Sequence, residues 1–467
     1  MLFNQKKQQS LAKRFPRNFV WGTATSAYQI EGAAKEGGRG PSIWDTFCDI
    51  PGKTVNGESG ELACQHYRHY AEDIALMADM GVSAYRLSIS WPRIMPDGRR
   101  SSLNQEGIDF YSRLIDECLA NSIEPWVTLY HWDLPEQLNT EVDGWLGASI
   151  SDLFADYADV CFSQFGGRVK HWITINEAWV VSVLGYGQGV FAPGHVSNSE
   201  PYEVGHNLLI AHAKAVKIYR DRYQSLQKGR IGISNNCDWR EPLTDSPEDK
   251  AAAQLSLEFF LGWFADPIYL GDYPESMKRN VGDRLPLITD EQRELIFQSS
   301  DFFGLNHYTT MFAAQGSDDY IAGSVYGNGG LNEDQCVNLS VGENWPKTHM
   351  QWAVVPWGCR KQLEWIATRY DNPEIVITEN GCAYNDQLVD GEVIDQQRIE
   401  FYASYLDECA NAIDNGVNLV GYFAWSFMDN FEWAQGYEKR FGLHYVDFET
   451  GERTAKASAK WFKEFLR

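Results

Sequence analysis

WITINEAWV, residues 172–180, begins as an apolar run with β-branched residues at alternate positions and ends abruptly in Asn176-Glu177. The alternation and the β-branched residues predict a buried strand. A glutamate at the end of a buried strand costs free energy unless another group pairs with it or the protein uses it in chemistry. The stretch therefore predicts a strand that delivers Glu177 to a site, where a second group is expected as its partner.

Seven further apolar, β-rich runs accompany this one, and amphipathic helical patterns fill the intervals. Two of these patterns, residues 63–81 and 398–416, place apolar residues at i, i+3 and i+4 and end in a glycine, which is typical of a helix C-terminus. Eight alternating units of strand and helix predict an α/β protein with a (β/α)8 TIM barrel. The expected strands are FVWGTAT (19–25), AYRLSIS (84–90), PWVTLYH (125–131), WITINE (172–177), GRIGISN (229–235), FFGLNHY (302–308), EIVITEN (374–380) and LVGYFAWS (419–426).

The length of 467 residues is compatible with two or three domains, but barrels with insertions also reach it as one domain. A doubly wound sheet is expected to show a Gly-rich phosphate turn after its first strand, and WGTATSAYQIEG has none. We therefore predict a single domain over residues 1–467 with extended βα loops. Residues 1–14 are expected to form a flexible tail, and the Gly-, Ser- and Asp-rich residues 314–335 a mobile loop at the barrel mouth.

Composition restricts the class of ligand. A formal net charge of -24 opposes binding to nucleic acid and to anionic membranes, because both are negatively charged. A neutral small molecule is a better match to this negative charge than either of these ligands. The sequence shows no apolar segment of signal-peptide or membrane-spanning length. Nine cysteines without C-x-x-C spacing suit a reducing compartment, so we expect a cytoplasmic protein. The oligomeric state is not indicated.

Polar residues close most of the predicted strands. In a barrel of this kind the active site lies at the C-terminal ends of the strands, so these residues are expected to meet. The set combines two strand-end glutamates with amides, histidines, an arginine and tryptophans. Its members are Gln29, Arg86, His131, Trp132, Asn176, Glu177, Asn306, His307, Tyr308, Glu379, Asn380, Trp425, Glu432 and Trp433.

Glu379 is the expected partner of Glu177. Paired carboxylates that flank a substrate are what cleavage of a glycosidic bond requires, one as proton donor and one as ionised nucleophile. Arg86 and the Tyr308 hydroxyl are expected to keep Glu379 ionised, whereas burial and the charge of Glu379 keep Glu177 protonated. Tryptophans such as Trp425 and Trp433 offer flat surfaces for the C–H faces of a sugar, and the amides and carboxylates match its hydroxyls.

Several long motifs resemble the ordered signatures of glycoside hydrolase family 1, the retaining β-glucosidase family. They run from about residue 15 to the C-terminus and include FVWGTATSAYQIEG, YRLSISWPRI, TLYHWDLP, TINEAW, GLNHYT, ITENG and WSFMDNFEWAQGYEKRFGL. The resemblance implies a barrel, a double-displacement mechanism and no metal or organic cofactor. It implies Glu177 as acid/base and Glu379 as nucleophile, with Arg86, Asn306 and Tyr308 supporting the nucleophile. The sugar is expected among Gln29, His131, Asn176, Glu432 and Trp433, above Trp425.

The motifs also depart from the family pattern. Ala178 stands where the family usually has a proline after the acid/base, which removes one backbone constraint. Relatives that cleave 6-phosphoglycosides usually have serine at the position of Glu432 and a tyrosine at that of Phe441, so an unphosphorylated substrate is expected, although Lys439 is present. The aglycone side is expected to include Trp179, Trp352 and Phe441.

The leading hypothesis is a retaining β-glucosidase that acts on cellobiose, short β-oligosaccharides and aryl or alkyl β-glucosides. Glu432 accepts from the 4- and 6-hydroxyls in this hypothesis, and an axial 4-hydroxyl also satisfies it, so β-galactosidase and β-fucosidase side activities are expected. Three alternatives stay open: a 6-phospho-β-glucosidase, a transglycosylase on the same barrel, and a non-catalytic sugar-binding protein.

Overall fold

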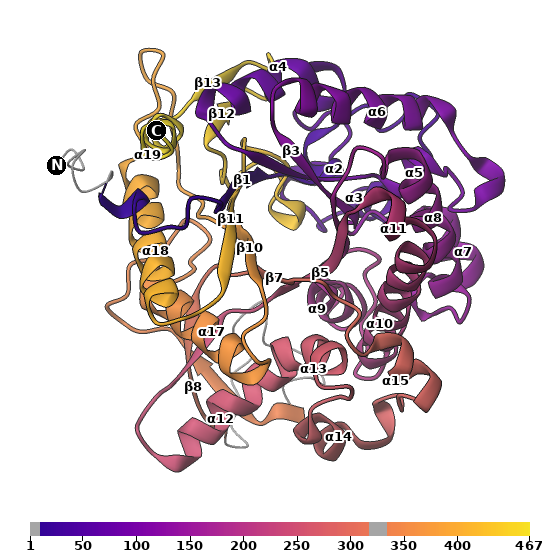
Figure 1. Ribbon diagram of the computed structural model, residues 1–467, viewed down its shortest axis with the longest axis vertical. Coiled ribbons are helices and arrows are strands. Elements are labelled where there is room, and N and C mark those ends of the chain that lie inside the picture. Colours follow the sequence, from indigo (N-terminus) through magenta and orange to yellow (C-terminus); the bar gives the residue numbers. More distant parts are fainter. Residues whose placement is uncertain (1–9, 317–333) are drawn as a thin grey trace.

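The computed structural model describes residues 10–316 and 334–467, and its centre is a closed barrel of eight parallel strands (Figure 1). The barrel order is β1-β11-β10-β7-β5-β4-β3-β2, so neighbours in the chain are neighbours in the barrel. All eight predicted strands are barrel strands, and the predicted fold class is confirmed. The strands are β1 (Val20–Ala24), β2 (Ala84–Ser88), β3 (Glu124–Tyr130), β4 (His171–Asn176), β5 (Arg230–Asn236), β7 (Phe303–Asn306), β10 (Ile375–Asn380) and β11 (Leu419–Trp425).

Helices surround the strands (Figure 1). The two helical patterns predicted from spacing are α4 (His66–Met80) and α18 (Gln396–Asp414), and each is followed by a glycine with positive φ, Gly81 and Gly416. The other helices of six residues or more are α3 (Ile43–Cys48), α6 (Gln105–Ala120), α7 (Glu136–Val142), α8 (Ile150–Phe165), α10 (Glu200–Ile218), α12 (Pro247–Leu257), α13 (Trp263–Tyr269), α14 (Glu275–Val281), α15 (Asp290–Ile296), α17 (Pro356–Arg369) and α19 (Ala457–Phe465).

Shorter helical turns lie mostly in the connections. The four-residue and three-residue helices are α2 (Ala27–Ile30), α5 (Trp91–Ile94), α9 (Ala178–Val180) and α11 (Gln224–Gln227). Further 3-10 turns are Val55–Gly57, Arg100–Ser102, Gly144–Leu146, Gly282–Arg284 and Trp433–Gln435, and π-helical turns are Val181–Gly185, Tyr219–Tyr223 and Glu258–Gly262. Two of these turns, α9 and Trp433–Gln435, directly follow residues of the candidate site.

The barrel interior is filled by residues from alternate positions of the strands. Ala84, Trp126, Ile173, Val376 and Phe423, from five different strands, form one buried cluster that is separate from the larger core between strands and helices. Because successive side chains of a strand point to opposite faces, Arg86, Thr128 and Trp425, two positions beyond Ala84, Trp126 and Phe423, also face inward, nearer the C-terminal end. In β4 the register shifts between Ile173 and Asn176, and Ile175 packs in the larger core. The inward-facing positions at that end are therefore available for polar residues.

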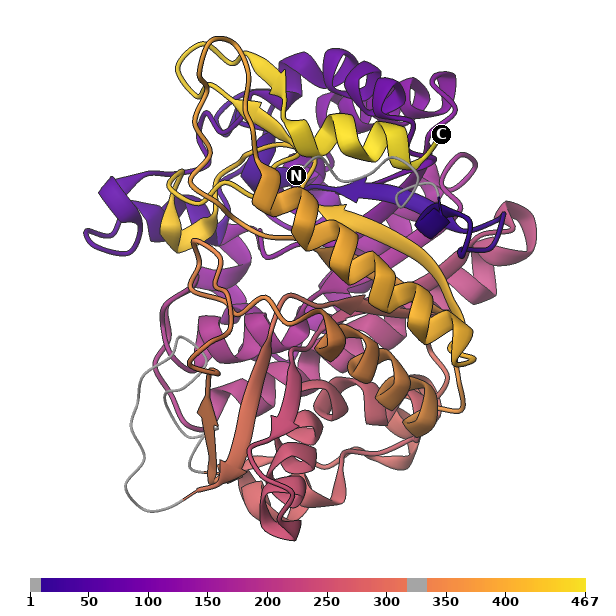
Figure 2. The ribbon, with the colours of Figure 1, turned by 90° about the vertical axis from the view of Figure 1, so that its left-hand side faces the viewer.

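The excess length over a minimal barrel lies partly in two small sheets. β6 (Trp239–Pro242), β8 (Thr310–Gln315) and β9 (Val337–Ser340) form a three-stranded sheet in the connections after β5 and β7. β12 (His444–Val446) and β13 (Arg453–Ala455) pair antiparallel after β11. In Figure 2, β8 lies below the barrel, and α18 and α19 face the viewer. These additions extend the walls around the C-terminal end of the barrel.

The flexible N-terminal tail was predicted to extend to residue 14, and this boundary is wrong. Leu11 is buried, and the Arg14 guanidinium makes ion pairs with Asp407 and Asp414 of α18, at 2.8 and 2.5 Å. Residues 10–14 therefore pack on the barrel, because their apolar side chain and charge find partners that the local sequence does not reveal. Residues 1–9, and residues 317–333 of the predicted mouth loop, lie outside the described residues. Within the described residues, no helix is long and apolar enough to cross a membrane.

Candidate active site

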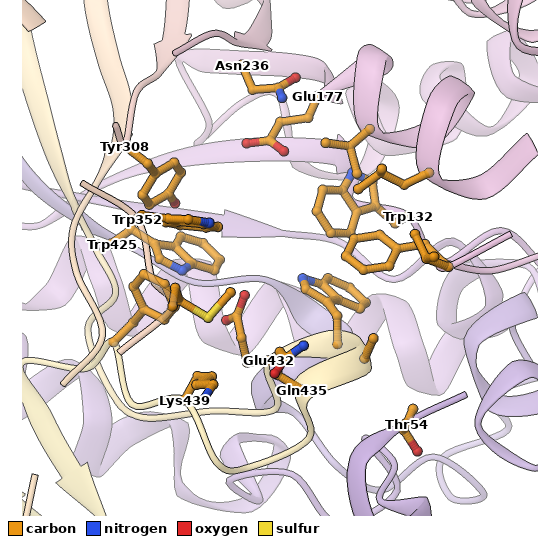
Figure 3. A pocket seen from close by; sticks show the side chains of 18 of the residues that line it. Thr54, Trp132, Glu177, Asn236, Tyr308, Trp352, Trp425, Glu432, Gln435 and Lys439 are labelled. Carbon is orange, nitrogen blue, oxygen red and sulfur yellow. The ribbon is translucent and has the colours of Figure 1, made fainter. Parts of the chain in front are cut away.

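A cavity of about 680 Å³ opens at the C-terminal ends of the barrel strands (Figure 3). Both predicted catalytic glutamates line it, together with His131, Trp425 and Trp433. Figure 3 shows the carboxylates of Glu177 and Glu432 pointing toward the same space. The topology explains this convergence, because parallel strands in a closed barrel all end at one rim.

Glu379 is held by a cation and a phenol. The Arg86 guanidinium donates to one carboxylate oxygen at 2.5 Å, and the Tyr308 hydroxyl donates to the other at 2.6 Å. Arg86 is fully buried and Glu379 is 3% exposed, so the ion pair lies in a low-dielectric region where its attraction is strong. Gly381, two residues later, lets β10 approach β11, since a Cβ there would lie 1.7 Å from the Trp425 carbonyl oxygen.

Glu177 has an amide partner, and within the described residues no cation forms an ion pair with it. The Asn306 amide donates to its carboxylate at 2.6 Å, and Asn306 also donates to the side-chain oxygen of Asn176 at 3.0 Å. That oxygen accepts from Arg86 at 2.6 Å as well. Asn306 was expected to support the nucleophile, and its amide does favour the ionised form of Glu379. It also bonds Glu177, because β7 lies between β5 and β10 and its last residue reaches both carboxylates.

The two glutamates have unequal surroundings. Burial raises the pKa of Glu177 well above its ordinary value, and the negative charge of Glu379 raises it further. Burial also raises the pKa of Glu379, but Arg86 and the Tyr308 hydroxyl favour its ionised form and oppose the shift. The pair titrates as a unit, and its singly protonated form carries the proton on Glu177 and the charge on Glu379.

The backbone is strained at four non-glycine residues that line the cavity. Glu177, Trp132, Gln351 and Trp433 have φ angles of 53°, 77°, 63° and 52°, in the left-handed region that bulky residues rarely adopt. Glu177 also caps α9, so its side chain leaves the strand direction and turns toward the cavity. Such conformations cost of order 1–3 kcal/mol each and persist where the surrounding structure over-determines them, which is common at functional sites.

The predicted sugar-binding residues fall into two layers. His131, Trp425, Glu432 and Trp433 line the cavity. Gln29 and Asn176 were expected to touch the sugar directly, but both are fully buried and lie behind the cavity wall. Gln29 donates to the Phe431 carbonyl at 2.9 Å and approaches Glu432 at 3.5 Å. The strand-end pattern does not separate these layers, because it specifies a position along the barrel axis and not a depth.

The inner wall matches a ligand with flat apolar faces and hydroxyl edges. The His131 ring lies nearly parallel to those of Trp425 and Trp433, with ring centroids 5.8 and 6.0 Å away. Asn176 donates to His131 Nε2 at 3.1 Å, which places the ring proton on Nδ1, and Nδ1 has no partner among the described residues. Burial lowers the pKa of His131, so the ring is neutral. Burial and Glu379 raise the pKa of Glu432 to about 8.

The outer wall is largely apolar. Trp352 and Phe441, both predicted there, line the cavity, and Trp352 packs beside Tyr308 with ring centroids 5.3 Å apart. Trp179 was also predicted there, but it is buried and packs edge-on against Phe260, 4.5 Å away. The position of Trp179 follows from the geometry of the helical turn that carries it.

Val180 and Leu184, four residues apart, share the helix face that lines the cavity. Trp179 precedes Val180 by one residue and therefore lies about 100° around the helix from that face. A helical wheel drawn from residue 178 onward would have excluded it.

Asn236 and Asp238 are polar residues of the cavity lining that were not predicted from the sequence. Figure 3 shows Asn236 next to Glu177, and its side-chain oxygen has no hydrogen-bond partner among the described residues. Burial raises the pKa of Asp238 to about 6, against the opposing charge of Arg240. The signal was present, because Asn236 and Asp238 close the fifth strand as Asn176 and Glu177 close the fourth.

Comparison with known proteins supports the same assignment. The model of the glycosyl hydrolase family 1 matches residues 11–467. Beta-glucosidase 42 of Arabidopsis thaliana is 48% identical over 97% of this chain and 94% of its own length, and beta-glucosidase 1B of Phanerodontia chrysosporium is 44% identical over 97% and 86%.

Solved structures agree. The rice Os3BGlu6 beta-glucosidase superposes with a TM-score of 0.93 at 42% identity over 97% of this chain and 99% of that one. The beta-glucosidase of Trichoderma harzianum superposes with a TM-score of 0.91 at 46% identity, with 97% of each chain covered. A match over nearly the whole chain in both sequence and structure confirms the resemblance seen in the motifs. The chain belongs to glycosyl hydrolase family 1, whose members hydrolyse glycosidic bonds.

Proposed function

We propose that this family 1 enzyme is a retaining β-glucosidase that removes terminal, non-reducing β-D-glucosyl residues. The observation that carries the proposal is the asymmetric pair of buried carboxylates in one cavity. Glu379 is bonded to Arg86 and Tyr308, and Glu177 is bonded to an amide and has a raised pKa. The names of the similar proteins from Arabidopsis, rice and Trichoderma agree with this activity.

In the first step, an oxygen of Glu379 attacks the anomeric carbon, and the bond from that carbon to the glycosidic oxygen breaks. Glu177 transfers its proton to the departing oxygen, so the aglycone leaves as a neutral alcohol. The sugar is then an ester of Glu379, and Glu177 is ionised. Arg86 and Tyr308 orient Glu379 and keep it deprotonated until it reacts.

In the second step, ionised Glu177 accepts a proton from water while the water oxygen attacks the anomeric carbon. The ester bond breaks, and Glu379 leaves as a carboxylate with its original partners. Esterification removes the charge of Glu379 that raises the pKa of Glu177, which suits Glu177 to the role of base. Two inversions at one carbon leave the β configuration unchanged.

The glucosyl unit is proposed to lie over Trp425, with His131 Nδ1 and Glu432 bound to its hydroxyls. Asn176 and Gln29 act from behind the wall: Asn176 fixes the tautomer of His131, and Gln29 contacts Glu432. The apolar outer wall favours aryl and alkyl aglycones, and Asn236 beside it offers a polar contact for a second sugar. Cellobiose and short β-oligosaccharides are therefore included among the proposed substrates.

Phosphorylated sugars fit less well. A phosphate at the 6-position would lie against Glu432, whose carboxylate repels a dianion when ionised. Lys439 lines the cavity, but its ammonium is bonded to Glu438 at 2.7 Å and is partly neutralised there. The proposed substrate is therefore an unphosphorylated sugar. The proposed compartment of the protein is the cytoplasm.

The proposal is tested with nitrophenyl β-glucoside, β-galactoside, β-fucoside, α-glucoside and 6-phospho-β-glucoside. The β-glucoside is expected to be among the best substrates, with weaker activity on the β-galactoside and β-fucoside. Proton NMR of the released sugar is expected to show the β anomer first. Preference for the 6-phospho-β-glucoside would overturn the proposed substrate. Release of α-glucose as the first anomer would overturn the retaining mechanism.

The pH dependence follows from the unequal pair. We expect a bell-shaped profile of kcat/KM, which rises as Glu379 ionises and falls as Glu177 loses its proton. The alkaline midpoint should lie well above the ordinary glutamate pKa of about 4.3, because burial and Glu379 raise the pKa of Glu177. In Tyr308→Phe, loss of the hydroxyl that favours ionised Glu379 should move the acid limb about one pH unit upward.

Initial rates from pH 4 to 9 with nitrophenyl β-glucoside measure this profile for both proteins. An acid limb that stays in place, or moves downward, in Tyr308→Phe would contradict the hydrogen-bond assignment.

Glu432→Gln tests the sugar-binding carboxylate. The amide keeps the size of the side chain but replaces one carboxyl oxygen with an NH2 donor, so kcat/KM for the β-glucoside should fall about 10²-fold. The loss should be smaller for the β-fucoside, which lacks the 6-hydroxyl. Steady-state kinetics with both substrates measures the difference, and Glu449→Gln, at an exposed position, is the control. Equal losses on both sugars would contradict contact with the 6-hydroxyl.

A further inference from the structure

The segment from Ser426 to Leu443 forms the part of the cavity wall that carries Glu432 and Trp433. It contains one 3-10 turn, Trp433–Gln435, and no longer helix or strand. Backbone hydrogen bonds of regular structure therefore cannot hold most of it in place. A few backbone hydrogen bonds join it to the barrel, such as those from the Phe427 N–H to the Ala24 carbonyl and from the Phe431 N–H to the Gln29 carbonyl. Side chains on the side away from the cavity add further bridges.

Asp429 closes the segment into a loop. One carboxylate oxygen accepts from the Arg440 guanidinium at 2.7 Å, and the other accepts from the backbone N–H of Gly442 at 2.9 Å. A residue near the start of the segment thus binds two residues near its end. Asp429 is completely buried and the Arg440 side chain is 17% exposed, so solvent weakens these charge-assisted bonds only slightly.

Lys456 connects this loop to a second one. Its ammonium, also completely buried, donates to Asp429 at 2.6 Å and to Asp386 at 2.5 Å. Asp386 lies in the connection that follows β10 and the nucleophile Glu379. The Lys456 backbone N–H donates to the Leu443 carbonyl at 3.0 Å, which places the lysine at the end of the segment.

Arg398 completes the set from α18. It pairs with Asp386 at 2.7 Å and Asp395 at 2.5 Å, and it donates to the carbonyl of Arg440 at 2.8 Å. The resulting buried charge network contains three cations and three anions, whose formal charges cancel. Its members are Asp386, Asp395, Arg398, Asp429, Arg440 and Lys456.

A short path leads from this network to the sugar-binding carboxylate. Asn430, which follows Asp429, accepts from the Gln29 amide at 3.0 Å. Gln29 also donates to the Phe431 carbonyl at 2.9 Å and approaches Glu432 at 3.5 Å. A displacement of Asp429 therefore moves the partners of Gln29 and, with them, the carboxylate of Glu432.

We propose that Lys456 is a positioning residue for glucosyl recognition, which acts through Asp429 and Gln29 on Glu432. Lys456 does not line the cavity and touches no substrate. Without its ammonium, Asp386 and Asp429 each keep one arginine partner, and Arg398 still joins the two loops through Asp386 and the Arg440 carbonyl. The loops therefore lose the direct bridge between the two aspartates. The proposal rests on the proposed function, because it concerns how that site holds a glucosyl unit.

The test is a double-mutant cycle of Lys456→Met and Glu432→Gln. Methionine keeps most of the length and volume of lysine but lacks the charge. Lys456→Met alone is expected to lower kcat/KM for nitrophenyl β-glucoside about tenfold, with a smaller loss on the β-fucoside. In the Glu432→Gln background the same change should alter kcat/KM less than about twofold, since the group it positions is already altered.

Lys460→Met, one turn later on α19, is the control, because Lys460 is exposed and lies 3.5 Å from its partner Glu392. It is expected to behave as wild type. A folded Lys456→Met protein with unchanged kinetics, or an equal loss in both backgrounds and on both sugars, would overturn the positioning role. Lack of hydrolysis by the wild-type enzyme would instead overturn the proposed function, so the two failures are distinguishable.

Circular dichroism establishes whether each variant is folded. Should Lys456→Met fail to fold, Asp429→Asn, which keeps the side-chain size and one acceptor oxygen, enters the same cycle with the same expected pattern. Failure of both variants to fold would also overturn the proposal, because the network would then support the whole barrel and not one segment of its wall.

Discussion

Glu379→Gln is expected to lower kcat for every β-glycoside about 10⁴-fold or more. The amide accepts the Tyr308 hydrogen bond, but it is far too weak a nucleophile to displace an alcohol. The substitution also leaves the buried Arg86 guanidinium without its counter-ion, which should lower the free energy of unfolding by about 3–5 kcal/mol. Rates with nitrophenyl β-glucoside and a urea unfolding curve measure both effects.

Glu374→Gln, five residues earlier, is the matched control, because Glu374 pairs with Arg230 at a partly exposed position. It should keep full activity. A second, smaller variant, Glu379→Gly, leaves room for an added nucleophile. With azide it is expected to form α-glucosyl azide, since only one displacement then occurs at the anomeric carbon. Formation of the β-azide by this variant, or turnover by Glu379→Gln near the wild-type rate, would assign the nucleophile to another residue.

Glu177→Gln is expected to lose activity in proportion to the basicity of the leaving group. Cellobiose and alkyl glucosides need a proton on the departing oxygen, so their kcat/KM should fall about 10³-fold. Dinitrophenyl glucoside leaves without one and should still form the glucosyl ester of Glu379. The ester then persists because no base activates water. Mass spectrometry should detect one added glucosyl unit on the protein.

Azide distinguishes the roles of the two glutamates. It needs no general base, so it should release the ester in Glu177→Gln and give β-glucosyl azide, the opposite anomer to that from Glu379→Gly. The fold should tolerate the change, since glutamine still accepts the Asn306 hydrogen bond and removes a buried group whose ionisation is disfavoured. An equal loss for good and poor leaving groups would exclude Glu177 as the acid.

The prediction of the fold from sequence succeeded because the pattern repeats. Each barrel strand is a short apolar run, and helical patterns such as residues 63–81 fill the intervals between the runs. Eight independent signals support one topology, so an error in a single boundary does not change it. The fifth strand was predicted correctly, yet its closing residues Asn236 and Asp238 were overlooked, although the rule that identified Glu177 applies to them equally.

The depth of each side chain in the barrel wall, and the direction in which it points, were less predictable. Gln29 and Asn176 were placed in contact with the sugar but lie behind the wall, and Trp179 faces Phe260 and not the cavity. Residues at a strand end are specified along the axis of the barrel by the period of two. How far each side chain extends, and which way a following helix turns it, depends on neighbours from other strands.

The sequence by itself determined the barrel, the two carboxylates at its rim and the family, because hydrophobic periodicity and contiguous motifs are local properties of the chain. Only the tertiary structure decided that Asn306 bonds Glu177, and that Lys456 bridges Asp386 and Asp429 behind Glu432. These contacts join residues that are far apart in the chain. Their energies depend on burial and on distances within a few ångströms, quantities that exist only once the strands have closed into a barrel.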